Sequence, residues 1–113
     1  MSVEQASGHE PVELGFIESL ENMISVQEGS TVSRTVMQRE GGNVVLFSFD
    51  AGEELSEHTA AMPVFVQTLE GRLKVTGNGR TVALVLGGLA YFPTPILISV
   101  YAEDPSIILL PIF

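Results

Sequence analysis

The sequence predicts a single all-β domain in which short antiparallel strands form a sandwich or a barrel. A chain of 113 residues has the size of one domain. Hydrophobic residues make up 45% of it and charged residues 17%, which is a globular composition. Short runs rich in Val, Ile, Leu and Thr are separated by Gly, Pro and Asn, with no helical stretch between them. This spacing is typical of a sandwich or barrel and argues against a parallel α/β fold.

Roughly eight or nine short strands are expected from about residue 23 onward. The clearest hairpin follows the alternation of Leu73 and Val75 with polar neighbours, because Asn78-Gly79 tolerates the positive φ angles of a type I′ turn. The remaining runs are Thr31–Met37, Val44–Phe49, Val64–Leu69, Val82–Leu86, Tyr91–Phe92, Ile96–Tyr101 and Ile107–Leu110. We expect the aromatic residues Phe65, Tyr91 and Phe92 to lie in the core or the barrel wall.

The N-terminal region differs from the rest of the chain. Residues 1–28 carry six acidic residues and no Lys or Arg. We therefore divide the chain into an acidic arm, 1–22, and a barrel domain, 23–113. Pro11 could open a short helix in the arm, because Val12, Phe16, Leu20 and Ile24 repeat every four residues. The alternative is an arm that pairs with a sheet edge or with a partner subunit.

The charge balance limits the partners. Fourteen Asp and Glu oppose five Lys and Arg, a net charge of −9, which excludes the basic footprint of nucleic-acid binding and disfavours an anionic membrane surface. There is no cysteine for a disulfide or a thiolate site. The 21 uncharged residues 82–102 are interrupted by Gly and Pro, so we interpret them as strands rather than a membrane span. The polar, acidic start has no signal-peptide pattern, and we expect a cytoplasmic protein.

The C-terminal run Ile107–Phe113 is apolar at successive positions, so both faces of this strand need cover. Two structures could cover the second face of this strand. One is the N-terminal arm of the same chain, and the other is a second copy of the chain. We favour the second and predict a homodimer, with the arm and the C-terminal strand as interface candidates.

Two motifs with fixed spacing lie within residues 44–113. In the first, Gly52 is followed by His58, Ala60, Val64 and Gly71, and in the second, Gly87 is followed by Pro93, Pro95, Ile98 and Ala102. This register resembles the two motifs of the cupin superfamily, the first built on His-x-His and Glu between glycines, the second on Pro-x-Gly, His and Asn after a glycine. Gly52, His58, Gly71, Gly87 and Pro93 match without an insertion. The resemblance implies a double-stranded β-helix, or jelly-roll, barrel.

The departures from the family pattern concern the metal site. In metal-binding cupins, two His and one Glu of the first motif and one His of the second hold a divalent ion inside the barrel. Here only His58 is kept, and the other three positions are Ala60, Val64 and Ile98. A transition metal needs about three or more protein donors. We therefore expect no metal cofactor, and hold a divalent ion at His58 as the alternative.

The resemblance turns these positions into a predicted ligand site. If they face inward, the barrel interior is an apolar pocket with His58 as its one polar group. The predicted lining is His58, Ala60, Met62, Val64, Val66 and Ile98. His58 could instead be a hydrogen-bonded structural residue. The nearby Glu53, Glu54 and Glu57, with Asp50 slightly earlier, fit a solvated loop; the alternative is a displaced carboxylate–histidine site. Glu54 shares strand parity with His58, whereas Glu57 should point outward.

Three functions remain open. The first is a metal-free module that binds a small apolar ligand in the barrel. The second is a structural or interaction protein whose barrel is filled. The third is a dioxygenase- or isomerase-type cupin enzyme with an altered metal site around His58. We assign no catalytic residue, because Ala60, Val64 and Ile98 replace the donors on which such an enzyme depends.

Overall fold

The computed structural model describes residues 13–60, 63–93 and 96–112, with the backbone alone for residues 57–60 and 96. Its nine strands confirm the predicted all-β fold. The strands are β1 (Thr31–Arg39), β2 (Gly42–Phe49), β3 (Glu54–Ala60), β4 (Val64–Glu70), β5 (Arg72–Gly77), β6 (Arg80–Val85), β7 (Leu89–Phe92), β8 (Ile96–Ala102) and β9 (Ser106–Ile112). The described residues contain no helix long and apolar enough to cross a membrane, and the uncharged run 82–102 contributes to β6, β7 and β8.

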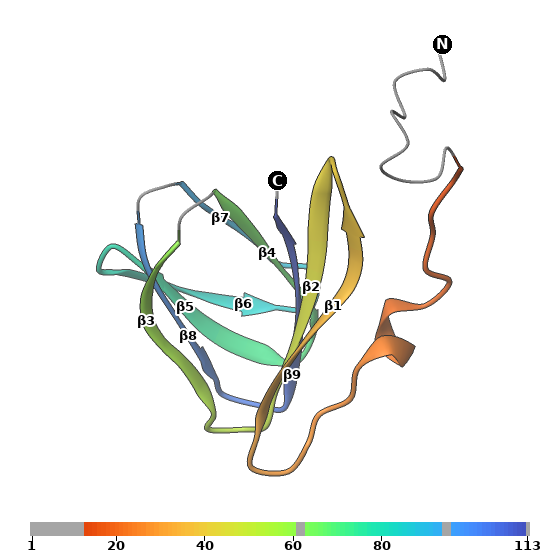
Figure 1. Ribbon diagram of the computed structural model, residues 1–113. Helices are drawn as coiled ribbons and strands as arrows, with labels where there is room; N and C mark the ends of the chain where they lie inside the picture. Colours follow the sequence, from red (N-terminus) through yellow and green to blue (C-terminus); the bar gives the residue numbers. More distant parts are fainter. Residues whose placement is uncertain (1–12, 61–62, 94–95, 113) are drawn as a thin grey trace.

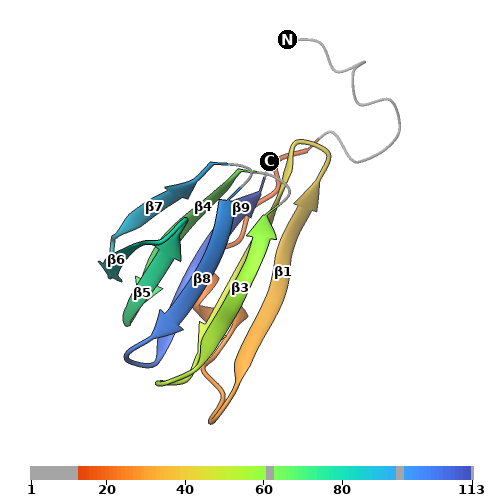
Figure 2. The ribbon, with the colours of Figure 1, turned by 90° about the vertical axis from the view of Figure 1, so that its left-hand side faces the viewer.

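Two antiparallel sheets face each other to form the barrel (Figures 1 and 2). One sheet has five strands in the order β1-β2-β9-β4-β7, and the other has four in the order β3-β8-β5-β6. Apart from the hairpins β1–β2 and β5–β6, neighbouring strands are not consecutive in the sequence, as a jelly roll requires. Because β6 and β7 each end a sheet, no ladder of backbone hydrogen bonds joins the two sheets at that side in the described residues.

The core lies between the sheets and follows the two-residue period of the strands. On β4, Val64, Val66 and Thr68 are buried while the residues between them are only partly covered. Leu73 and Val75 of β5 alternate in the same way with exposed neighbours. The buried cluster consists of Phe49, Val64, Val66, Leu73, Val75, Leu84, Phe92, Ile98, Val100, Ala102 and Ile108. The predicted hairpin at Asn78-Gly79 is present, with φ angles of 53° and 85°.

The N-terminal segment covers part of the outer face of the five-stranded sheet (Figure 1). Leu46 and Ile107 are 0% and 4% exposed, yet neither belongs to the cluster between the sheets. Ser48, paired with Ile107, donates a hydrogen bond from Oγ to the Ser25 carbonyl, 3.1 Å away. The Arg34 guanidinium donates to the Met23 carbonyl at 2.6 Å. The segment just after the predicted arm 1–22 therefore contacts the outer face of β1 and β2 through the Met23 and Ser25 carbonyls.

The four-residue hydrophobic period of the N-terminal region does not form an α-helix among the described residues 13–30. The one helical element among these residues is the short 3-10 helix η2 (Leu20–Met23). Leu14 and Phe16 are 87% and 75% exposed, so a helix there would gain no burial from them. Pro11 and Val12 lie outside the described residues. Backbone carbonyls of the N-terminal region, rather than an apolar helix face, form its hydrogen bonds to the sheet.

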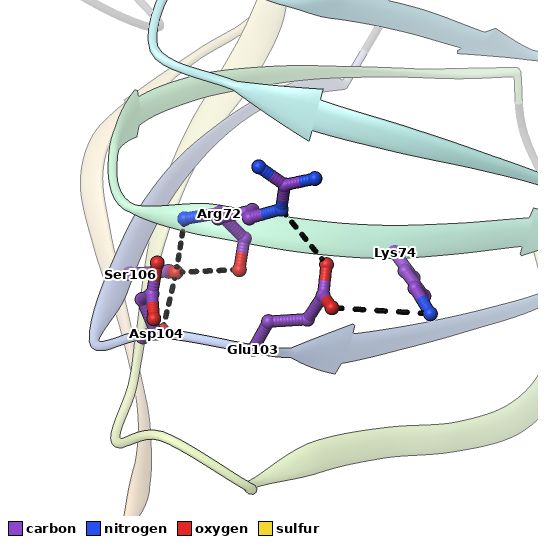
Figure 3. Close-up of polar contacts among 5 residues, drawn as sticks. All are labelled: Arg72, Lys74, Glu103, Asp104 and Ser106. Carbon is purple, nitrogen blue, oxygen red and sulfur yellow. Dashed lines mark hydrogen bonds and ion pairs between the residues drawn. The ribbon is translucent and has the colours of Figure 1, made fainter.

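A polar corner fixes the turns at the end of the barrel where β4 passes into β5 (Figure 3). Ser106 Oγ accepts a hydrogen bond from the Arg72 backbone N–H at 3.1 Å and donates to the Asp104 carbonyl at 2.7 Å. The Glu103 carboxylate forms ion pairs with the Arg72 guanidinium at 3.2 Å and with the Lys74 ammonium at 3.8 Å. Gly71 has a φ of +87°, and a Cβ there would collide with Ser106 and the Pro105 carbonyl. Only glycine fits this close approach.

Replacing Gly71 with alanine should destabilise the fold by more than the cost of its backbone angle. Gly52 is the matched control, because its φ is +85° but nothing lies within 4 Å of its added Cβ. We expect about 1 kcal/mol of lost stability for Gly52→Ala and at least about 3 kcal/mol for Gly71→Ala, measured by urea unfolding. Equal losses would contradict the steric role of the corner.

Candidate functional site

A pocket lies at one side of the barrel, between the edge strands β6 and β7. Its volume is about 420 Å³, within the range of pockets that bind small molecules. The described residues that line it are Val75, Gly77, Arg80, Val82, Leu89, Ala90, Tyr91 and Phe92. They come from both sheets, so the pocket lies where the two layers face each other without hydrogen bonds.

The pocket has an apolar floor and a mixed rim. Val75 and Phe92 are 1% and 4% exposed and belong to the core cluster, and Ala90 packs against it. The rim contains exposed side chains, among them Leu89, Tyr91 and Arg80. A molecule in this pocket would place its apolar part against the core and keep its other end near water.

Strand register connects this pocket with the predicted ligand positions. Val64 lies opposite Phe92 and Val66 opposite Ala90 across the β4–β7 pair, and Ile98 lies opposite Gly77 across β5–β8. Directly opposed residues on one face have Cβ atoms about 5 Å apart. The three predicted residues are 8%, 2% and 5% exposed. They form the packed interior one strand away from the pocket, and none of them lines it.

The remaining predicted residues are placed by backbone alone or not at all. The backbone of His58 pairs with Ile98, and that of Ala60 pairs with Ile96. Ile98 in turn pairs with Gly77, and Gly77 pairs with Arg80. The backbone of His58 therefore lies in the same cross-strand row as Arg80 on the pocket rim. Met62 lies outside the described residues.

The parity argument that linked Glu54 with His58 is wrong. The β3–β8 register shifts between Leu55 and His58: Leu55 pairs with Val100, and three residues later His58 pairs with Ile98. The extra residue is a bulge, which reverses the inward and outward positions beyond it. Glu54 is exposed and pairs with the exposed Tyr101. The strand register therefore removes the parity argument that favoured Glu54.

The donors present do not fit the metal that the fold family implies. Ala60, Val64 and Ile98 carry no N, O or S atom in their side chains, which leaves one imidazole from the four ligand positions. One neutral ligand does not hold Zn²⁺ or Fe²⁺ against water. Among the described residues, no group of three or more His, Asp or Glu side chains gathers elsewhere to replace them.

The sequence interpretation missed the pocket itself. Its lining comes from β5, β6 and β7, whereas the motifs directed attention to β3, β4 and β8. Phe92 is in the barrel wall as expected, but Tyr91 is 52% exposed and contacts Phe65 with ring centroids 4.9 Å apart. The signal available was the alternation along β7, which places Ala90 and Phe92 on one face and Leu89 and Tyr91 on the other.

Comparison with known proteins supports the fold at the level of structure. No family model matches the sequence, and no curated protein matches it. A conserved protein of unknown function from Streptococcus pyogenes is 25% identical, with a TM-score of 0.78 and 89% of each chain covered. A cupin superfamily protein from Desulfitobacterium hafniense is 21% identical, with a TM-score of 0.77, over 83% of this chain and 86% of that one.

A further similar structure is a cupin 2 conserved barrel domain protein from Leptotrichia buccalis. It is 29% identical with a TM-score of 0.77, over 82% of this chain, which spans 45% of that longer protein. These likenesses agree with the spacing of Gly52, His58, Gly71, Gly87 and Pro93 and with the two-sheet jelly roll. The chain therefore has the cupin fold.

Proposed function

We propose that this small cupin-fold protein binds a small, largely apolar ligand without a transition metal, in the pocket between β6 and β7. The observation that carries the proposal is the pocket's floor of core residues, Val75, Ala90 and Phe92, beside an interior whose ligand positions are apolar. An apolar surface of this kind gains about 25 cal/mol for each Å² that a ligand covers. The described floor of this pocket carries no polar side chain. The polar side chains of the described lining, Arg80 and Tyr91, lie on the rim.

The filled-barrel alternative explains part of the interior. Val64, Val66 and Ile98 pack into the core, so their role in a ligand site is to close the space behind the pocket. A purely structural protein would have the same core. It would not need the open pocket next to it, and binding at Ala90 distinguishes the two functions.

The predicted homodimer and cytoplasmic location remain part of the proposal. Leu46 and Ile107 are already buried within the single chain. A dimer would therefore use apolar surface that is exposed elsewhere. Light scattering of the full chain would give twice 12.1 kDa for the dimer.

Filling the pocket should abolish binding of a neutral apolar probe. Cinnamamide is a suitable probe because its ring can lie on Phe92, and we expect a dissociation constant of about a millimolar. Ala90→Leu places a larger side chain in the pocket and should weaken binding by about tenfold or more, followed by ¹H–¹⁵N NMR of the full chain. Ala83→Leu on β6 is the control, since Ala83 is exposed and does not line the pocket.

The melting temperature of each variant shows whether it has folded, and Ala90→Val is a milder second variant. Unchanged affinity in a folded Ala90→Leu protein would reject the pocket. Loss of affinity in Ala83→Leu as well would show that the probe binds somewhere else.

Restoring the donors should create a metal site that the natural chain lacks. The triple substitution Ala60→His, Val64→Glu and Ile98→His completes a four-donor set with His58. We expect it to bind one Co²⁺ or Zn²⁺ per chain, seen by elemental analysis after dialysis and by a metal-dependent rise in melting temperature. The unmodified chain should retain no stoichiometric metal, and its melting should not respond to EDTA. A metal-dependent melting temperature in the unmodified chain would contradict the proposal.

A further inference from the structure

One basic side chain stands at the rim of the apolar pocket. Arg80 begins β6, directly after the Asn78-Gly79 turn, and its backbone pairs with Gly77. Both residues line the pocket. The rest of the described lining carries no charge, so the electrostatics of the pocket are determined by Arg80 and by the charges around it.

Arg80 differs from the other basic residues in having no protein partner among the described residues. Arg72 and Lys74 pair with Glu103 at 3.2 and 3.8 Å. Arg34 donates to the Met23 carbonyl and Arg39 to the Gln38 carbonyl. The Arg80 guanidinium is therefore the basic group whose donors meet no protein acceptor within the described part of the chain.

The acidic residues are concentrated at the other end of the barrel. The turns that join β2 to β3, β4 to β5 and β8 to β9 contain, or lie next to, Asp50, Glu53, Glu54, Glu70, Glu103 and Asp104. At the end to which the arrowheads of β1, β3 and β5 point, the β1–β2 and β5–β6 turns carry Arg39, Glu40 and Arg80 (Figure 2).

The distance between the two ends weakens the influence of the acidic turns. From Arg72 to Gly77, β5 rises about 17 Å at 3.3 Å per residue. The Debye length at physiological salt is about 8 Å, so exposed charges at the acidic end are largely screened at the pocket. An anion at the rim therefore meets Arg80 as its nearest strong charge, despite the net charge of −9.

From these features we propose that the pocket selects a small carboxylate with an apolar body, a ligand class that deepens the function proposed above and rests on it. The apolar body lies on Val75, Ala90 and Phe92. The carboxylate faces the Arg80 guanidinium, whose planar fork of N–H donors matches two carboxylate oxygens. The negative end stays at the exposed rim, where its desolvation cost is small.

A simpler role for Arg80 is protection of the β6 edge, since charged side chains on edge strands oppose strand-to-strand aggregation. If Arg80 only protects the edge, the affinity of the pocket does not depend on the charge of the ligand. Comparing ligands that differ in charge but hardly in shape therefore separates the two roles.

The test uses two matched pairs of probes, cinnamate with cinnamamide and hexanoate with hexanamide, titrated into the full chain and followed by ¹H–¹⁵N NMR. We expect each carboxylate to bind about three- to five-fold more tightly than its amide, with a ratio that falls as salt is raised. Arg80→Gln should bring this ratio to about one. Arg39→Gln changes the net charge by the same amount at the same end of the barrel, and should keep the ratio.

Failure of the ligand class is distinguishable from failure of the pocket. Equal binding of acid and amide to the unmodified chain overturns the carboxylate proposal and leaves the apolar pocket standing. A preference that survives Arg80→Gln, or disappears equally in Arg39→Gln, overturns the role of Arg80. If none of the four probes binds saturably, the proposed function fails and the ligand class fails with it.

Discussion

The packing of two sheets that remain unjoined along β6 and β7 is the constraint on which the site depends. β1 and β3 end the two sheets at the other side, and at the β6–β7 side the layers are held by apolar residues of the core such as Val75 and Phe92. A ladder of hydrogen bonds would bring the strands to about 4.8 Å and leave no room for a ligand. Side-chain packing tolerates a gap at the surface, provided that the core beneath it is continuous. The pocket is therefore a consequence of how this barrel is left open.

The same packing involves two of the positions that correspond to metal ligands in the cupin motifs. Positions 64 and 98 lie inside the core, where a carboxylate or imidazole would need a partner to offset its desolvation. Val64 and Ile98 avoid that requirement and contribute burial in its place. Interior stability and metal binding compete for the same positions, and in this chain apolar packing occupies them.

Much of the fold could be predicted from local chemistry. The hairpin at Asn78-Gly79 follows from backbone angles, and the barrel core follows from the alternation of Val64, Val66 and Val75. The bulge in β3 could not be predicted, because residues 54–58 give no Gly or Pro signal there, and it reversed the expected position of Glu54. The pocket was also missed, because it depends on which strands are left at the two sheet edges. Strand order is a property of the whole chain and has no local signal in β6 or β7.

Some residues of the pocket belong to the packed core, and others lie outside it and can be substituted with less effect on the fold. Val75 and Phe92 are core residues, so truncating either would be expected to cost about 2–5 kcal/mol of stability and to confuse binding with unfolding. Ala90 and Arg80 are different, since Ala90 contributes little volume and Arg80 has no protein partner in the described part of the chain. Under the proposed function, the floor supplies affinity for an apolar body, and the rim, on an edge strand next to a tight turn, sets the preference among ligands. A barrel built in this way can change its ligand at β6 and β7 without disturbing the packing that holds its sheets together.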